Sequence, residues 1–202
     1  TRYSTTGELM MRNVQPLFAV LDFGGLGIAH NGNLTNAVTV RKELVSTGCI
    51  FQSTTDTEII IHLMATTRGT VVDRLVSALR RVEGAYSLAV MGQGFLIGVR
   101  DPHGVRPLVL GQLGDSYILA SETCAFDIIG ATYMRDVEPG EVVVIDENGL
   151  HSHRPFPVTK SRYCIFEHIY FSKPDSIFDG TSVYEARKRI GMELAREFPV
   201  EA

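Results

Sequence analysis

The sequence predicts an α+β fold, because its helical and strand patterns occupy separate parts of the chain. The 202 residues are 45% hydrophobic and 21% charged, an ordinary globular composition that can form a core without disulfides or metal. Apolar residues at helical spacing prevail between residues 36 and 82, and short apolar runs separated by glycine-containing turns follow them. Helices segregated from runs of antiparallel strands are typical of α+β proteins rather than of doubly wound sheets.

The first stretch predicts a strand after an apolar segment. Residues 14–21 are apolar and contain Pro16, and residues 24–30 are small and apolar enough for a strand. Asn31 and Gly32 follow, a pair that strongly favours a two-residue turn. The simplest interpretation of this pair is a hairpin turn.

The next stretch predicts helices. Residues 36–45 have apolar positions at helical spacing. Thr55 with Glu58, and Thr70 with Asp73, have the form of capping boxes, in which a hydroxyl is followed three residues later by a carboxylate. We expect the two helices that they open to run almost back to back.

The period then changes to that of strands and predicts an antiparallel meander. The strands expected in this meander cover residues 85–91, 95–99, 108–110 and 117–120. A short helix is expected over 122–129, and a further hairpin over 142–145 and 150–153. A proline-containing linker over 154–163 separates them from an amphipathic helix that begins near Ser182. The chain opens on Thr1 rather than on Met and closes on Ala202 without a cap, so we expect it to be a piece of a longer protein.

Composition excludes several classes of protein. A net charge of −4 with scattered lysines and arginines argues against a nucleic-acid partner. No apolar run approaches the roughly 18 residues of a membrane span, and no signal peptide is recognisable. Cys49, Cys124 and Cys164 are an odd number at long spacings, which favours a reducing compartment such as the cytoplasm. The histidines lack metal-ligand spacing, so no metal site is expected from them.

Three sets of polar groups could bind a substrate. Arg2 suits a carboxylate or phosphate, although a solvated strand edge explains it as well. Asn31 and Gly32 could supply a side-chain amide and a backbone N–H to an oxyanion hole instead of forming a turn. Asp56 is explained as a helix-start residue but could also hold an ammonium group. No serine has a GxSxG setting and no cysteine is flanked by a base, so these binding groups come without a recognisable nucleophile.

Seven motifs occur in an order that points to a known family. They are residues 2–7 (RYSTTG), 30–34 (HNGNL), 53–58 (STTDTE), 84–87 (GAYS), 100–108 (RDPHGVRPL), 121–125 (SETCA) and 170–176 (YFSKPDS). Together they resemble the amidophosphoribosyltransferase family, also called glutamine phosphoribosylpyrophosphate amidotransferases, over essentially the whole chain. Glucosamine-6-phosphate synthase and asparagine synthetase share the arginine, Asn-Gly and aspartate elements but resemble the chain less in the first, fifth and last motifs.

The resemblance implies an N-terminal-nucleophile hydrolase fold, an αββα sandwich of antiparallel sheets between helical layers. In that family the thiolate of an N-terminal cysteine attacks the side-chain amide of glutamine, forms a thioester and releases ammonia, with the α-amine of the same residue as base. Carried onto this sequence, Arg2 binds the α-carboxylate of glutamine, Asp56 binds its α-ammonium group, and Asn31 with Gly32 forms the oxyanion hole. The nucleophilic cysteine is expected upstream of Thr1, so this polypeptide alone is expected to be inactive.

The resemblance also divides the chain. Residues 1–158 are expected to form an N-terminally incomplete glutaminase domain, and residues 159–202 a linker and the start of an α/β phosphoribosyltransferase domain. The complete enzyme, a cytoplasmic homo-oligomer, would pass ammonia to phosphoribosyl pyrophosphate with Mg²⁺ and form 5-phosphoribosylamine, the first step of de novo purine biosynthesis. Some members hold a 4Fe–4S cluster whose first cysteine ligand lies near the position of Cys164, whereas clusterless members can keep a cysteine there too.

Two other functions stay open at this point. The chain could be the glutaminase domain of an enzyme that aminates a sugar phosphate. It could also be a pseudo-glutaminase, a catalytically inactive module that binds an amino acid or a partner through Arg2, Asn31 and Asp56.

Overall fold

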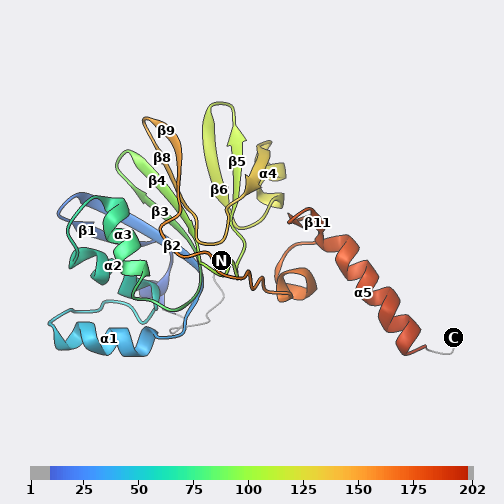
Figure 1. Ribbon diagram of the computed structural model, residues 1–202, viewed down its shortest axis with the longest axis horizontal. Helices are drawn as coiled ribbons and strands as arrows, with labels where there is room; N and C mark the ends of the chain where they lie inside the picture. Colours follow the sequence, from blue (N-terminus) through green and yellow to red (C-terminus); the bar gives the residue numbers. More distant parts are fainter. Residues whose placement is uncertain (1–9, 200–202) are drawn as a thin grey trace.

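The computed structural model describes residues 10–199 and arranges them in four layers followed by a projecting helix (Figure 1). The layers are a group of helices, a six-stranded sheet, a three-stranded sheet and a short helix. The αββα sandwich that the resemblance implies is confirmed.

The larger sheet is antiparallel and has the strand order β1-β2-β3-β4-β8-β9. Its strands are β1 (Leu17–Leu21), β2 (Gly24–Leu34), β3 (Gly84–Gly92), β4 (Phe95–Arg100), β8 (Val142–Asp146) and β9 (Gly149–His153). Successive residues of a strand point to opposite faces, so each strand contributes to two cores. In β8, Val142 and Val144 join the core under the helices, whereas Val143 and Ile145 join the core between the sheets.

Three helices cover one face of the larger sheet: α1 (Ala37–Ser46), α2 (Thr57–Ala65) and α3 (Val71–Leu79). Seven of the nine residues of α2 are buried, which makes it the central helix of this layer. The capping box predicted at the start of α3 is present, because Thr70 Oγ1 accepts the Asp73 N–H and the Asp73 carboxylate accepts the Thr70 N–H. Arg74 then forms a bidentate ion pair with Asp22, which attaches α3 to the β1–β2 turn.

The smaller sheet has the strand order β6-β5-β7 and packs against the other face of the larger one. Its strands are β5 (Val109–Leu113), β6 (Ser116–Ala120) and β7 (Thr132–Asp136). The sheets approach closely at Gly98 of β4, where a Cβ atom would lie 2.7 Å from Leu119 Cδ1. On the outer face, buried Phe126 of α4 (Cys124–Ile129) packs over Gly111 and completes the fourth layer.

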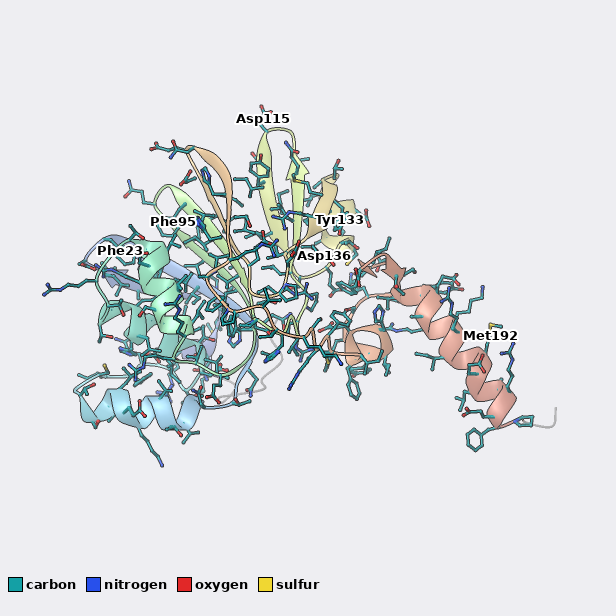
Figure 2. All side chains as sticks on the ribbon, in the orientation of Figure 1. Phe23, Phe95, Asp115, Tyr133, Asp136 and Met192 are labelled. Atoms are coloured by element: carbon teal, nitrogen blue, oxygen red, sulfur yellow. The ribbon has the colours of Figure 1, made fainter. Side chains whose placement is uncertain are left out.

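The chain after β9 leaves the sandwich. It forms a π-helical turn η2 (Glu167–Phe171), a short hairpin of β10 (Ile177–Phe178) and β11 (Thr181–Ser182), and the helix α5 (Val183–Glu197). Figure 2 shows Met192 on α5, far from Asp115 in the β5–β6 turn and from Phe23 in the β1–β2 turn. A 3-10 turn, η1 (Met11–Asn13), precedes β1. Within residues 10–199, no helix is long and apolar enough to cross a membrane. The domain boundary at residues 158 and 159 stays a prediction.

Two local predictions are wrong. Asn31 and Gly32 do not form a turn but lie inside β2, opposite Ser87 and Tyr86, because pairing with β3 outweighs the local preference for a turn. Thr55 and Glu58 do not form a capping box, because the Glu58 carboxylate is engaged by backbone N–H groups that precede the helix.

The predicted meander is also wrong as a single unit. The strands expected over residues 85–91 and 95–99 lie in the larger sheet, whereas those over 108–110 and 117–120 form a hairpin in the smaller one. The further hairpin expected over 142–145 and 150–153 is confirmed as β8 and β9. The strand β7, which completes the smaller sheet, was not expected. Its residues are mostly exposed and show no apolar alternation.

Candidate active site

Asn31, Gly32 and Asp56, three of the predicted site residues, lie at or near the end of β2. Asn31 and Gly32 lie three and two residues before Leu34, the last residue of this strand. Asp56 precedes α2, and its Oδ2 accepts the Leu34 N–H at 2.8 Å. Asp56 reaches the end of β2 because α2 packs against this strand. Arg2 lies outside the described residues.

Gly32 adopts a backbone conformation that favours glycine. Its φ is +151°, and a Cβ atom there would overlap the Ala85 carbonyl and lie 2.8 Å from His30 Nε2. Gly32 also stands opposite Tyr86 in the β2–β3 ladder. The close approach of these two strands thus requires glycine at this position.

A cavity of about 200 Å³ lies between the two sheets beside Asn31. Its lining includes residues 29–31 of β2 and 87–89 of β3, with Leu108, Leu119 and Ser121 from the side of the smaller sheet. Asn31 shares a strand face with Ala29, because side chains alternate along β2. The Asn31 amide therefore borders a space in which a small polar group can bind.

Asp56 is almost enclosed, with 5% of its surface exposed. Its Oδ1 lies 3.7 Å from His30 Nδ1, while Oδ2 accepts the Leu34 N–H. Burial by itself raises the pKa of Asp56, but the nearby His30 ring and the Leu34 N–H outweigh burial and hold this pKa below its ordinary value. Asp56 is thus a carboxylate at neutral pH, the form that binds an ammonium group.

His30 is a site residue that sequence reasoning missed. Its Nδ1 lies 3.1 Å from Thr57 Oγ1, and its Nε2 lies 3.3 Å from the Ala85 carbonyl oxygen. The ring therefore connects the Asp56 carboxylate to the backbone of β3. Its position next to Asn31 is the signal that identifies it, whereas a lone histidine without metal-ligand spacing indicates only a structural or surface residue.

Two further charged side chains hold the loop that carries Asp56. Arg41 of α1 donates from Nη2 to the carbonyl oxygens of Ser53 and Thr55, at 3.0 and 2.9 Å. Glu58 accepts the Ser53 N–H at 2.7 Å and the Ser53 hydroxyl at 2.6 Å. Sequence spacing gave no indication of Arg41, because its role depends on α1 packing beside this loop.

Cys164 lies apart from this site, in the segment after β9, where its N–H donates to the Val105 carbonyl oxygen at 3.1 Å. Among residues 10–199, no group of three or more His, Cys, Asp or Glu side chains is arranged to hold a metal ion. The described residues therefore do not by themselves form a ligand set for an iron–sulfur cluster or for Mg²⁺.

The two packed sheets, the glycine-dependent end of β2 and the ionised Asp56 are the features expected of a glutamine amidotransferase domain. The family model described as "Glutamine amidotransferase domain" matches residues 1–127, so the chain belongs to that class. The amidophosphoribosyltransferases of Rhizobium etli and Bacillus subtilis are 51% and 45% identical to it, in each case over 100% of this chain. Within the class, the chain belongs to the amidophosphoribosyltransferase family.

Solved structures agree with this assignment. The glutamine phosphoribosylpyrophosphate amidotransferase of B. subtilis, complexed with ADP and GMP, matches with a TM-score of 0.92 and 44% identity over 96% of this chain. A structure described as the allosteric regulatory enzyme of purine biosynthesis matches with a TM-score of 0.90 and 45% identity over 95% of this chain. The chain spans 42% and 43% of the R. etli and B. subtilis sequences, about two fifths of their length.

Proposed function

We propose that this chain is the glutamine-binding part of an enzyme that hydrolyses glutamine and transfers the ammonia to phosphoribosyl pyrophosphate. The product is 5-phosphoribosylamine, in the first step of de novo purine biosynthesis. The observation that carries the proposal is the end of β2, where Asn31 borders the cavity between the sheets and Asp56 accepts the Leu34 N–H two residues beyond Gly32. Membership of the amidophosphoribosyltransferase family supports the choice of acceptor.

Asn31 and Gly32 would stabilise the negative charge that develops on the glutamine side-chain oxygen. A thiolate that adds to the amide carbon turns the carbonyl oxygen into an oxyanion. The Asn31 side-chain amide and the Gly32 N–H are donors of the type that binds such an oxyanion. Because both belong to β2, which is paired along this stretch with β3, their positions are set before the substrate binds.

Asp56 and Arg2 would bind the amino-acid end of glutamine. Asp56 Oδ2 accepts the Leu34 N–H, whereas Oδ1 lies 3.7 Å from His30 Nδ1, so Oδ1 is the oxygen through which we expect Asp56 to accept the α-ammonium group. A guanidinium such as that of Arg2 matches the α-carboxylate with two parallel hydrogen bonds. The pair would select an amino acid with free α-groups.

The nucleophile is proposed to be the family's N-terminal cysteine rather than a cysteine of this chain. Burial raises the pKa of the Cys124 thiol, which disfavours the reactive thiolate. Cys164 lies in the segment after β9, away from Asn31 and Asp56.

The acceptor half of the reaction is proposed to use Mg²⁺, bound with the pyrophosphate group of the acceptor. A 4Fe–4S cluster with Cys164 as a ligand would need further ligands beyond those that residues 10–199 place together. We also propose that the complete enzyme is a cytoplasmic homo-oligomer. The free state of Cys49, Cys124 and Cys164 is in line with a reducing compartment.

Activity measurements on the complete gene product test the proposed function. With glutamine as donor, we expect glutamate release to depend on phosphoribosyl pyrophosphate and to accompany 5-phosphoribosylamine formation. Transfer to fructose 6-phosphate instead would assign the domain to sugar-phosphate amination. Tight glutamine binding without glutamate release under either condition would favour a pseudo-glutaminase.

A further inference from the structure

The chain that follows β9 is attached to a loop beside the candidate active site. The Arg162 N–H donates to the His103 carbonyl oxygen at 2.8 Å, and the Cys164 N–H donates to that of Val105 at 3.1 Å. The buried Asp101 carboxylate shapes this loop, because it accepts the N–H groups of both His103 and Val105. Residues 162–164 are thus hydrogen-bonded to the loop over residues 101–105, which Asp101 holds in place.

A largely buried ion pair fastens η2 to the same loop. Arg106 Nη1 lies 2.7 Å from Glu167 Oε1, and the Glu167 side chain is 5% exposed. The other carboxylate oxygen of Glu167 accepts the Ser172 hydroxyl at 2.7 Å, and the Arg106 guanidinium lies 4.5 Å from the centre of the Phe171 ring. Removing one partner of such a pair leaves a buried charge without compensation, so the pair strongly favours one position of η2.

The ion pair is connected to the oxyanion-hole strand through the backbone of Arg106. The Arg106 carbonyl oxygen accepts the Ser87 hydroxyl at 3.1 Å and Arg100 Nε at 2.8 Å. Ser87 stands directly opposite Asn31 in the β2–β3 ladder. A shift of the Arg106 backbone would therefore move Ser87 of β3, which pairs with Asn31 of β2.

The other side of the ion pair leads to α5. Arg187 of α5 donates from Nε to the His168 carbonyl oxygen at 2.8 Å and from Nη2 to that of Ser172 at 2.7 Å. A second attachment follows η2, where Glu122 Oε2 accepts the Lys173 N–H at 2.8 Å. The turn η2 is thus held between the sandwich and the helix that leads away from it (Figure 1).

We infer that Arg106 and Glu167 are positioning residues that hold residues 164–176, and with them α5, at a set place relative to the oxyanion hole. The inference rests on the proposed function and deepens it, because this placement determines what fraction of the ammonia released from glutamine reaches the acceptor. Neutral ammonia is small and escapes into water unless the site that releases it and the site that consumes it are aligned. Transfer also depends on the distance and orientation of the reacting groups, so small displacements of these groups have large effects on its rate.

The complete enzyme with Glu167→Gln tests this role, since the substitution keeps the size of the side chain and removes its charge. We expect glutamate formed to exceed 5-phosphoribosylamine formed, whereas the two amounts stay nearly equal in the unaltered enzyme. Synthesis from free ammonia should persist. Arg154→Gln is the matched control, because its ion pair with Glu138 is exposed and lies outside this junction, so the product ratio should not change.

Amide hydrogen exchange measures how firmly this segment is held, and the measurement does not depend on catalytic activity. In Glu167→Gln, exchange over residues 164–176 should accelerate by about tenfold, the scale expected when a hydrogen-bonded charge is lost. Exchange in Arg154→Gln should match the unaltered protein. Ser172→Ala removes only the hydrogen bond to Glu167 Oε2 and should give a smaller change in the same direction, which keeps the test available if Glu167→Gln does not fold.

The inference is overturned if folded Glu167→Gln or Ser172→Ala leaves both the product ratio and the exchange rates unchanged. Faster exchange with an unchanged ratio would also overturn it, since the pair would then stabilise the segment without directing ammonia. An unaltered enzyme that transfers no ammonia to phosphoribosyl pyrophosphate contradicts the proposed function instead. Exchange over residues 164–176 would in that case still decide whether the ion pair positions the segment.

Discussion

Glu58 and Asp73 occupy the same place in two similar motifs but act differently. Asp73 completes a capping box with Thr70 at the exposed start of α3. Glu58 turns away from Thr55 and binds the backbone and hydroxyl of Ser53, in a buried loop where those donors need an acceptor. The local motif predicts a helix start in both cases, whereas the role of the carboxylate depends on which donors the fold leaves buried.

Asn31→Ala in the complete enzyme should lower kcat for glutamine hydrolysis by about 10²–10³, because one donor of the oxyanion hole is lost. Synthesis from free ammonia should be retained, since it bypasses this step. Steady-state kinetics with the two nitrogen donors measures the difference. An equal loss with both donors would instead indicate that Asn31 maintains the fold of β2.

Asp56→Ala should raise KM for glutamine strongly and leave ammonia-dependent synthesis unaffected, because the carboxylate would bind the α-ammonium group of glutamine. Asp115→Ala is the control, since Asp115 lies in the exposed β5–β6 turn, away from the site (Figure 2). Comparison of KM values with the two donors provides the measurement. Loss of both activities in Asp56→Ala would mean that Asp56 serves mainly to hold Leu34.

At the scale of elements, Glu141 joins the two sheets. It precedes β8 of the larger sheet and forms a bidentate ion pair with Arg135 of β7, with both N–O distances at 2.8 Å. The Ser152 hydroxyl of β9 donates to the same carboxylate at 2.6 Å. Burial raises the pKa of Glu141, but the hydrogen bonds from Arg135 and Ser152 outweigh burial, so this pKa lies below its ordinary value.

Glu141→Gln should lower the free energy of unfolding by about 1.5–3 kcal/mol at neutral pH, the range for hydrogen bonds to a charged group. A carboxyl group whose pKa is lowered by folding stabilises the fold at pH values above its pKa in the unfolded chain, about 4.3. This stabilisation is lost as the pH falls through the lower pKa of the folded state. The difference between the two proteins should therefore shrink in acid. Denaturant unfolding across pH measures it, and exposed Glu138→Gln, whose partner is Arg154, should cost little.

The elements themselves were predictable wherever apolar periodicity was strong. The helix expected over 36–45 is α1, and the strands expected over 85–91 and 95–99 are β3 and β4. Periodicity could not assign strands to sheets, because it reports which face is apolar but not which surface covers that face. The exposed strand β7 has no such signal, so it depends on pairing with β5.

At the scale of the whole molecule, α5 exposes apolar side chains. Tyr184, Ile190 and Leu194 are exposed on the helix that projects from the sandwich, and Phe198, which directly follows the helix, is exposed too (Figure 1). An apolar helix face is ordinarily buried against another element. The described residues thus leave α5 with a surface suited to packing.

The 202-residue polypeptide should therefore self-associate in a concentration-dependent way, and Ile190→Glu combined with Leu194→Glu should reduce this association. Sedimentation velocity over a range of concentrations measures it. Lys188→Glu is the control, because it adds negative charge at an exposed position that carries no apolar side chain. A polypeptide that stays monomeric at every concentration would contradict this expectation.

The sequence by itself determined the family, the α+β class and the candidates Asn31, Gly32 and Asp56, because local motifs and periodicity are properties of neighbouring residues. Only the tertiary structure revealed His30 and Arg41 beside Asp56, and the ion pair that attaches η2 to the sandwich. These contacts join residues far apart in the chain, and they exist because helices and strands bury their apolar faces together. The Asn-Gly pair marks this division, since its local preference is a turn and the pairing of β2 with β3 makes it part of a strand.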